Sequence, residues 1–311
     1  MTTRLRLRGA PVRRAGFTLS EILVTLVIMS VVLGTLMRVI VRQQQFYRST
    51  SDITDTRSQI RQGAAVLPAD LRGVSIPGGD IIAASSSSVE FWATIGAGVV
   101  CQAATTGATS LMLAPDTTLA NGAQLTSFLY TPAAGDVIAV MHDGATQGTE
   151  NWKKYTITAA PSRVSLCGVT SGFIAASDPN GISIGTQAMT AAVPSGAPVR
   201  VLRHVKYELY KSGTDGQWYL GYSECSTGTC TPQPVAGPFR PATADSTTSG
   251  LTLTYLDANG QALASPVTLT SIAAVAITLR GQSQGIIAIP GRARDYYRDY
   301  LNVRVALRNR R

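Results

Sequence analysis

The chain has 311 residues, of which 14% are charged and 45% are hydrophobic. An average soluble domain has roughly 25% charged residues, so this chain is unusually poor in charge. Its hydrophobic content excludes a highly charged disordered protein, and its length is sufficient to bury a large core. The sequence contains two His residues, which argues against a His-based metal centre.

The net charge of +9 is concentrated at the two ends of the chain. Residues 1–16 contain five Arg and no acidic residue, and residues 292–311 contain seven Arg and two Asp. Between them, residues 43–291 contain 13 basic and 15 acidic residues and are therefore nearly neutral. This distribution argues against a uniformly basic surface of the kind that binds nucleic acid.

An apolar segment follows the basic N-terminal residues. From Phe17 to Met37 the only charged residue is Glu21. A helix of 21 residues is about 32 Å long, which is enough to cross the hydrocarbon core of a bilayer, roughly 30 Å thick. The unbalanced arginines before this segment predict a cytoplasmic N-terminus, with the rest of the chain on the other side of the membrane.

Two other interpretations of this segment are a cleaved secretory signal peptide and a plain membrane anchor. A signal peptide is disfavoured because the apolar run is long and no A-x-A site follows it; the chain continues Val41-Arg42-Gln43-Gln44-Gln45. A plain anchor leaves Glu21 unexplained. A carboxylate at the centre of a membrane helix costs on the order of 3 kcal/mol, and the sequence shows no partner for it nearby.

The residues Arg14-Ala15-Gly16-Phe17-Thr18-Leu19-Ser20-Glu21 resemble the processing motif of type IV pilins and type II secretion pseudopilins. The resemblance implies that a prepilin peptidase cuts between Gly16 and Phe17 on the cytoplasmic side and methylates the new amine of Phe17. It also implies that Glu21 pairs with the Phe17 amine of a neighbouring subunit, because a buried carboxylate is tolerated opposite an ammonium group.

The same resemblance implies the partners and the location of the protein. The partners are other pilin or pseudopilin subunits, the prepilin peptidase, the inner-membrane assembly platform and the lipid bilayer. The expected location is the inner membrane, with a single pass and a cytoplasmic N-terminus. The head is expected in the periplasm or in the extracellular filament.

The helix is predicted to continue beyond the membrane. Apolar residues recur there at helical spacing, which predicts a stripe that packs on the rest of the protein: Phe46, Ile53, Ile60, Ala64, Leu67, Leu71 and Val74. Pro68 lies within this stripe and predicts a kink, or a break into a second short helix, at Leu67.

After Val74 the sequence predicts an antiparallel β-rich head with long Gly, Ser and Thr loops. The predicted strands are Val89–Trp92, Asp136–Met141, Tyr155–Thr158, Val199–Tyr210, Trp218–Tyr222, Leu251–Leu256, Ile272–Leu279 and Val303–Leu307. The predicted fold class is therefore α+β, with a long N-terminal helix, half in the membrane and half amphipathic, packed on this head. The predicted divisions are a leader at 1–16, a transmembrane part at 17–41, an amphipathic helix at 42–75 and a head at 76–311.

The head is loosely similar to large minor subunits, the group of the J-type pseudopilin and the W-type minor pilin. The similarity lies in the order of four segments: Val205–Tyr210, Gly250–Gly260, Ile272–Leu279 and Val305–Asn309. Residues 80–200 fall outside the similarity and are interpreted as an insertion specific to this protein. The length of the chain also favours a minor subunit over a major one.

The four cysteines allow three disulfide pairings, and export to an oxidising compartment favours their oxidation. Cys225 and Cys230 are close in sequence and are expected to close a local loop, which leaves Cys101 with Cys167. A zinc site is the alternative, but His142 and His204 are far apart in sequence and no second close Cys pair exists.

No catalytic motif supports an enzyme. G-x-S-x-G, Walker A and H-E-x-x-H motifs are absent, and no cofactor is expected. His142 and Asp143 are interpreted as part of a solvated loop and not as a catalytic dyad. The resemblance instead makes the protein a substrate of the prepilin peptidase.

The Arg-rich C-terminal segment has two interpretations. Tyr residues interleave with its arginines, a combination that suits a DNA strand or phosphate surface, and the candidate contacts are Arg292, Arg294, Arg298 and Arg304. A last strand with a solvated polar face explains the same residues and is preferred.

Taken together, the sequence predicts a minor pilin or pseudopilin that primes a type IV pilus or type II secretion pseudopilus or lies near its tip. The alternative is a pilus-associated adhesin or DNA-binding minor pilin.

Overall fold

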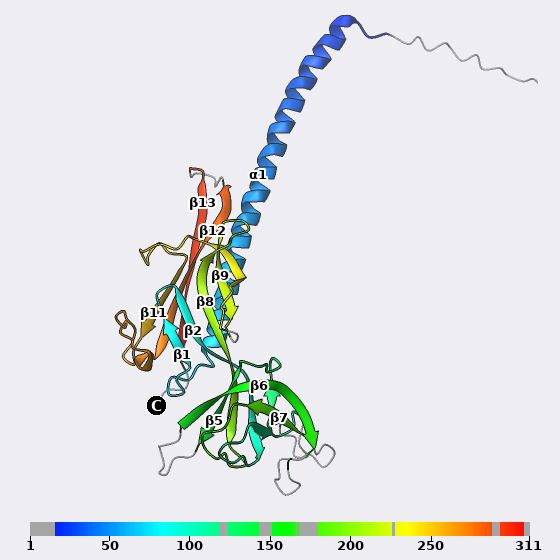
Figure 1. Ribbon diagram of the computed structural model, residues 1–311. Coiled ribbons are helices and arrows are strands. Elements are labelled where there is room, and N and C mark those ends of the chain that lie inside the picture. Colours follow the sequence, from blue (N-terminus) through cyan, green and yellow to red (C-terminus); the bar gives the residue numbers. More distant parts are fainter. Residues whose placement is uncertain are drawn as a thin grey trace, which may run out of the picture.

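A long helix and a β-rich head make up the protein (Figure 1). The computed structural model describes residues 16–117, 124–142, 151–165, 167, 180–225, 228–287 and 293–307. The elements are α1 (Leu19–Leu71), β1 (Ile81–Ala84), β2 (Ser88–Gln102), β3 (Ser110–Leu113), β4 (Ser127–Phe128), β5 (Val137–His142), β6 (Asn151–Ser165), β7 (Asn180–Thr186), β8 (Pro198–Lys211), β9 (Trp218–Glu224), β10 (Gln233–Phe239), β11 (Leu251–Leu256), the short 3₁₀ turn η1 (Leu269–Ser271), β12 (Ala274–Ile287) and β13 (Asp295–Ala306).

The α+β fold class predicted from the sequence is confirmed. The pairings between the described strands are antiparallel, and each of the eight predicted strand segments overlaps an observed strand. The strands follow the order β1-β2-β3-β7-β6-β5-β8-β9-β10-β12-β11, with β13 on the other side of β12 and β4 beside β2.

Helix α1 continues through Pro68 and ends at Leu71, so the predicted break into a second short helix at Leu67 is wrong. Proline cannot donate the backbone hydrogen bond of its own turn. Here it lies in the last turn, where its carbonyl still accepts the Arg72 amide at 3.2 Å. Leu67, Pro68 and Leu71 are all buried, and this packing offsets the bond that Pro68 does not donate.

The second half of α1 packs on the sheet, mainly against β10, β12 and β13. In the predicted apolar stripe Ile60, Leu67, Leu71 and Val74 are buried and Ala64 is half-buried, whereas Phe46 is 61% exposed. Two glycines permit the close approach of helix and sheet. A Cβ at Gly63 of the helix would lie 3.0 Å from the Leu279 side chain, and a Cβ at Gly281 of β12 would lie 2.7 Å from Ile60.

Replacing Gly281 by Val is therefore expected to destabilise the contact between helix and sheet. The added side chain would collide with Ile60 and Thr56, and overpacking of this kind costs about 1–3 kcal/mol. Thermal unfolding of the full-length protein in detergent measures the effect. Gly285→Val is the matched control, since Gly285 lies on the same strand and a Cβ there meets no atom within 4 Å. Equal decreases of the unfolding midpoint in the two variants would show that the contact between Gly281 and the helix is not responsible for the loss of stability.

The head contains two hydrophobic cores. The first, which we call the helix-side core, lies under α1 and includes Leu67, Phe91, Tyr207 and Val275. The second, which we call the distal core, includes Ile138 and its neighbours on β3, β5, β6 and β7. Figure 1 shows the strands around the distal core as a separate lobe below the helix.

Two long strands connect the lobes. The chain leaves the helix-side core along β2 and returns to it along β8, and each strand contributes buried residues to both cores. The two strands pair from Ser88–Glu208 to Val99–Pro198, and the register shifts between Thr94 and Gly96. The distal lobe therefore falls within the stretch 80–200 that the family similarity does not cover, although β1 and the start of β2 belong to the helix-side core.

The C-terminal segment forms strand β13, which pairs with β12 along most of its length. This agrees with the interpretation of a last strand. A polar contact also fixes β13 to the helix, because Arg57 Nε donates to the Tyr297 hydroxyl at 2.9 Å and to Asp299 Oδ2 at 3.1 Å.

Candidate processing and assembly site

The predicted cleavage position lies in an exposed extended segment. Gly16 and Phe17 precede the helix, which begins at Leu19, and the Phe17 side chain is 80% exposed. No other part of the described protein comes within 4 Å of a Cβ placed on Gly16. Within the described part of the chain, nothing outside this segment covers the Gly16–Phe17 bond.

Glu21 has a local partner that the sequence analysis missed. Thr18 is the N-cap of α1, and its backbone N–H and hydroxyl both donate to Glu21 Oε2, at 2.9 and 3.0 Å. In return the Glu21 amide donates to Thr18 Oγ1 at 3.4 Å. This is a capping box, in which two otherwise unpaired amides at a helix start are satisfied. The Thr-x-x-Glu spacing just before an apolar run was the signal for it.

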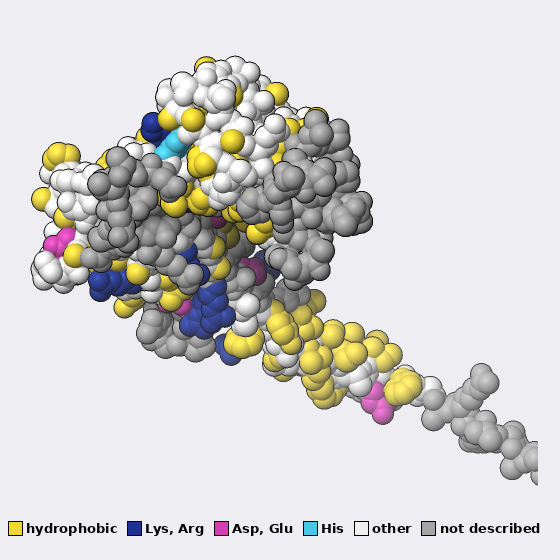
Figure 2. Space-filling model, turned by 90° about the horizontal axis from the view of Figure 1, so that it is seen from below, with side chains coloured by type: hydrophobic (Ala, Val, Ile, Leu, Met, Phe, Trp, Pro, Cys, Tyr) yellow, Lys and Arg dark blue, Asp and Glu magenta, His cyan; other side chains and the backbone are white. Residues whose placement is uncertain are grey.

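The first half of α1 carries an uncovered apolar surface. The large apolar side chains from Phe17 to Val41 are each 45–80% exposed, and Figure 2 shows them as a continuous apolar column that leaves the head. By length and composition α1 contains one segment able to cross a membrane. The apolar N-terminal segment fits a membrane anchor, because water contact over this area is unfavourable.

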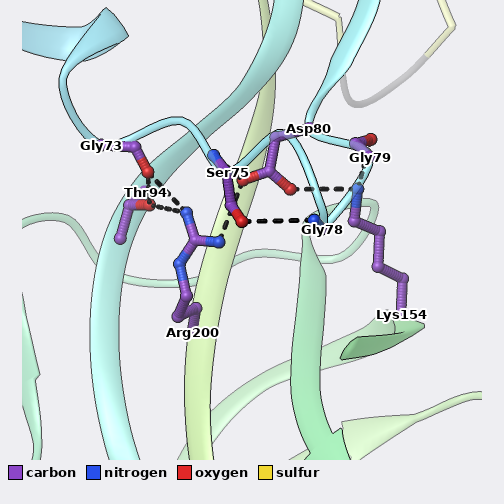
Figure 3. A network of polar contacts seen from close by, with 8 residues as sticks. All are labelled: Gly73, Ser75, Gly78, Gly79, Asp80, Thr94, Lys154 and Arg200. Atoms are coloured by element: carbon purple, nitrogen blue, oxygen red, sulfur yellow. Dashed lines mark hydrogen bonds and ion pairs between the residues drawn. The ribbon is translucent and has the colours of Figure 1, made fainter. Parts of the chain in front are cut away.

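The end of α1 is joined to the head by a buried carboxylate, Asp80, whose side chain is 1% exposed. Arg200 Nη1 lies 2.9 Å from Asp80 Oδ2, and Lys154 Nζ lies 3.1 Å from Oδ1 (Figure 3). The Ser75 amide also donates to Oδ2 at 2.8 Å. We call Asp80, Arg200, Lys154 and Ser75, with the groups they contact, the Asp80 network.

The Asp80 network connects three parts of the fold. Arg200 on β8 donates its other nitrogen to the Gly73 carbonyl just after α1 and to Thr94 Oγ1 on β2, both at 2.7 Å. Lys154 on β6 of the distal lobe donates to the Gly79 carbonyl at 2.7 Å. The segment between helix and sheet is therefore fixed to both lobes, which sets the direction of α1 relative to the head.

A second carboxylate, Asp70, is half-buried in the last turn of α1 and accepts a hydrogen bond from the Tyr207 hydroxyl at 2.6 Å. Burial raises the pKa of Asp70 above its ordinary value, and the hydrogen bond from Tyr207 lowers it by less. The folded protein therefore holds this proton at a higher pH than the unfolded chain does. The charged form of Asp70 opposes folding, and this penalty disappears as the pH falls through the folded pKa.

Asp70→Asn is expected to match or exceed the stability of the native protein at neutral pH, because Asn still accepts the Tyr207 hydrogen bond and carries no charge. On acidification the native protein should gain stability relative to the variant. Unfolding midpoints of both proteins across the acidic range measure this difference. A native protein that loses stability relative to Asp70→Asn on acidification would contradict the raised pKa.

The cysteines are joined as two disulfides, Cys101–Cys167 in the distal lobe and Cys225–Cys230 after β9. These are the pairs that the sequence analysis favoured. Among the described residues no group of three or more His, Cys, Asp or Glu side chains is placed to hold a metal ion.

His142 is the last residue of β5 and is 8% exposed, so its interpretation as a solvated loop residue is wrong. Its Nε2 lies 3.3 Å from the Tyr155 hydroxyl, and the side chain packs between strands. Asp143 lies outside the described residues. The continuous apolar run along 137–141, rich in β-branched residues, was the signal that His142 continues this strand.

The candidate phosphate-binding arginines do not converge on one site. Arg294 precedes β13, whereas Arg298 and Arg304 lie on it, and ten strand residues span about 33 Å. Arg298 Nη1 forms an ion pair with Asp295 at 3.0 Å. Arg292 lies outside the described residues. The described arginines are thus spread along one strand and form no compact binding site.

The comparisons with known proteins identify the N-terminal segment. Residues 12–37 match the family model of the prokaryotic N-terminal methylation motif. The match indicates a type IV pilin-like or pseudopilin-like precursor, and the motif in general implies a prepilin peptidase and other pilin subunits as partners. It gives no support for a particular subgroup such as the J-type or W-type subunits. No curated protein and no solved structure shows significant similarity to the chain.

Proposed function

We propose that this protein is a minor pilin or pseudopilin, which is processed at Gly16–Phe17 and assembled into a type IV pilus or a type II secretion pseudopilus. The observation that carries the proposal is the continuity of α1. One helix of 53 residues begins at the processing motif, exposes an apolar surface and ends packed on the head. The first half is suited to the membrane and then to the filament core, and the second half carries the head.

Processing changes the surroundings of Glu21. Cleavage after Gly16 creates an amine on Phe17, next to the capping box. In the precursor the Glu21 carboxylate accepts from the Thr18 amide and hydroxyl. We propose that in the filament it instead faces the Phe17 amine of a neighbouring subunit, so that each new subunit is held in axial register by one charge pair.

A minor role, in priming or near the tip, is supported by the size and form of the head. The distal lobe adds a second hydrophobic core beyond the part that packs on α1. A head of this kind adds bulk at the end distant from the membrane, where a terminal subunit has room for it and a repeating shaft subunit has less. We therefore propose that the protein belongs with the large minor subunits.

The orientation that we propose follows from the arginines before the helix. Five Arg in residues 1–16 place the N-terminus in the cytoplasm, with the head in the periplasm or on the filament. The disulfides agree with this side of the membrane, because disulfides persist in oxidising compartments.

The test is the mass and the N-terminal residue of the membrane-extracted protein, made with and without its prepilin peptidase. A chain that begins at methylated Phe17 only when the peptidase is present supports the proposal. A Gly16→Ala variant, which alters the residue before the cut, should stay unprocessed or be processed slowly. A chain that keeps residues 1–16 in the presence of the active peptidase would refute the proposal.

A further inference from the structure

We propose that Ile286 of β12 and Arg294 just before β13, together with the part of α1 beside them, bind the anionic headgroups of the bilayer that anchors the helix. The inference rests on the membrane location in the proposed function and adds a lipid contact of the head. We call this surface the membrane-proximal surface and define it by Gln45, Arg48, Ser49, Ile286 and Arg294. These residues line an open groove of about 520 Å³ between α1 and the hairpin.

The position of the surface along α1 places it at headgroup level. The transmembrane part predicted from the sequence ends at Val41, and Gln45 to Arg48 follow four to seven residues later. At 1.5 Å per residue they lie about 6–10 Å beyond that part of the helix. The polar headgroup layer is roughly 5–8 Å thick on each side of a bilayer. A helix that spans the membrane therefore brings this part of the head into or against the headgroups.

Two aromatic side chains mark the same level. Phe46 and Tyr47 are 61% and 71% exposed, and their rings contact each other edge to face, with centroids 6.2 Å apart. Tyr is enriched at the membrane–water interface, where its ring meets acyl chains and its hydroxyl meets water. Neither ring packs into the described core of the head, so a lipid interface accounts for their exposure.

The hairpin contributes an apolar and a basic side chain at this level. Ile286, near the end of β12, is 62% exposed, although the next residue, Ile287, is buried. Arg294 on the returning side of the hairpin is exposed. An exposed Ile beside an exposed Arg is suited to a surface where acyl chains and phosphate groups lie close together.

The charge of the region favours anionic lipid. Arg38, Arg42, Arg48 and Arg294 are exposed, and within the described part of the chain none of them forms an ion pair. The acidic residue that lines the same groove is Asp52. Phosphate is the group that unpaired guanidinium side chains bind best, through parallel N–H donors. The surface therefore favours a bilayer with anionic headgroups over a zwitterionic one.

The test measures the depth of three labelled positions in the full-length protein reconstituted into vesicles. The described cysteines are all in disulfides, so one added cysteine is labelled selectively. The labelled variants are Ile286→Cys on the hairpin, Ser30→Cys in the apolar half of α1, and Leu129→Cys, 76% exposed in the distal lobe. The vesicles contain phosphatidylcholine with or without phosphatidylglycerol, and lipids with a nitroxide at the headgroup or in the acyl chain quench the fluorophore.

We expect headgroup nitroxides to quench the Ile286 label several-fold more than the Leu129 label, and acyl-chain nitroxides to quench the Ser30 label. Phosphatidylglycerol should increase the Ile286 quenching. In an Arg48→Glu/Arg294→Glu variant this increase should disappear, since each basic side chain changes the affinity for an anionic surface about fivefold. The matched control is Arg72→Glu/Lys211→Glu, which alters two exposed basic residues outside the surface and should keep the increase.

Equal quenching of the Ile286 and Leu129 labels, with the Ser30 label quenched, would overturn the inference and leave the membrane anchor intact. If phosphatidylglycerol does not increase the quenching of the Ile286 label, the assignment to anionic headgroups is wrong. A Ser30 label that no lipid quenches would instead refute the membrane location in the proposed function. The processing test is independent of all three labels, so a failure of the proposed processing is recognised separately.

Discussion

Replacing Glu21 by Gln is expected to leave the protein in the membrane, with its helix start intact, and to prevent its entry into filaments. Gln at this position still accepts the Thr18 hydrogen bonds of the capping box, so the local structure is preserved. The variant loses only the negative charge. Loss of one partner of a buried charge pair costs about 3–5 kcal/mol, which corresponds to more than about a hundredfold loss in incorporation.

The measurement is the ratio of filament-associated to membrane-associated protein in cells that express each variant. Thr18→Val is the matched control, because it removes the N-cap hydroxyl and keeps the carboxylate. Its loss of one cap is worth about 1 kcal/mol, and it should assemble much better than Glu21→Gln. If Glu21→Gln assembles normally and Thr18→Val does not, Glu21 serves the capping box and not a charge pair between subunits.

Removal of the Asp80 carboxylate is expected to have the largest effect on the stability of the head. Asp80→Ala leaves Arg200 and Lys154 without their shared anion, although their side chains are only 14% and 23% exposed. Uncompensated buried charges of this kind cost about 3–5 kcal/mol. Asp80→Asn should lose less than Asp80→Ala, because its amide oxygen still accepts the Ser75 amide.

The unfolding midpoint of the full-length protein in detergent measures this loss. Asp295→Ala is the control. It removes an acidic side chain that is 60% exposed and pairs with Arg298, and such surface pairs contribute about 0–1 kcal/mol. Hydrogen exchange should also rise at Gly73–Asp80 in Asp80→Ala, since this segment loses its attachment to β6 and β8. A similar midpoint for Asp80→Ala and Asp295→Ala would contradict the central role of the network.

Local patterns predicted most of the elements of the fold. Strands such as Leu251–Leu256 and Val199–Tyr210 were found because β-branched and aromatic residues alternate within clear turn boundaries. The break at Leu67 was predicted wrongly because the effect of Pro68 depends on what it packs against, and the last turn of α1 lies in the core. His142 was misjudged because polar residues that follow it in sequence suggested a loop, whereas Tyr155 on β6 gives it a buried partner.

The residues of the candidate site also differ in how far the sequence could predict them. Gly16, Phe17 and Glu21 were found from a contiguous motif, and the Thr18–Glu21 capping box was present in the sequence but was overlooked. The Asp80 network could not be predicted. Its members are separated by as many as 127 positions, from Gly73 to Arg200. The pairings of β2 with β8, of β8 with β5 and of β5 with β6 bring them together. Contacts of this kind depend on topology and leave no local pattern.

The two continuous strands that join the lobes have a mechanical consequence. If α1 is pulled while the far end of the head is held, tension reaches the distal lobe along β2 and β8. These strands run lengthwise between the lobes (Figure 1), and eleven register pairs connect them. Because both strands are then stretched in the same direction, the load runs along two covalent backbones in parallel, and the pairing between them keeps the strands aligned. The distal lobe is therefore attached to the helix-side core by a stiff two-stranded connection and not by a single flexible linker.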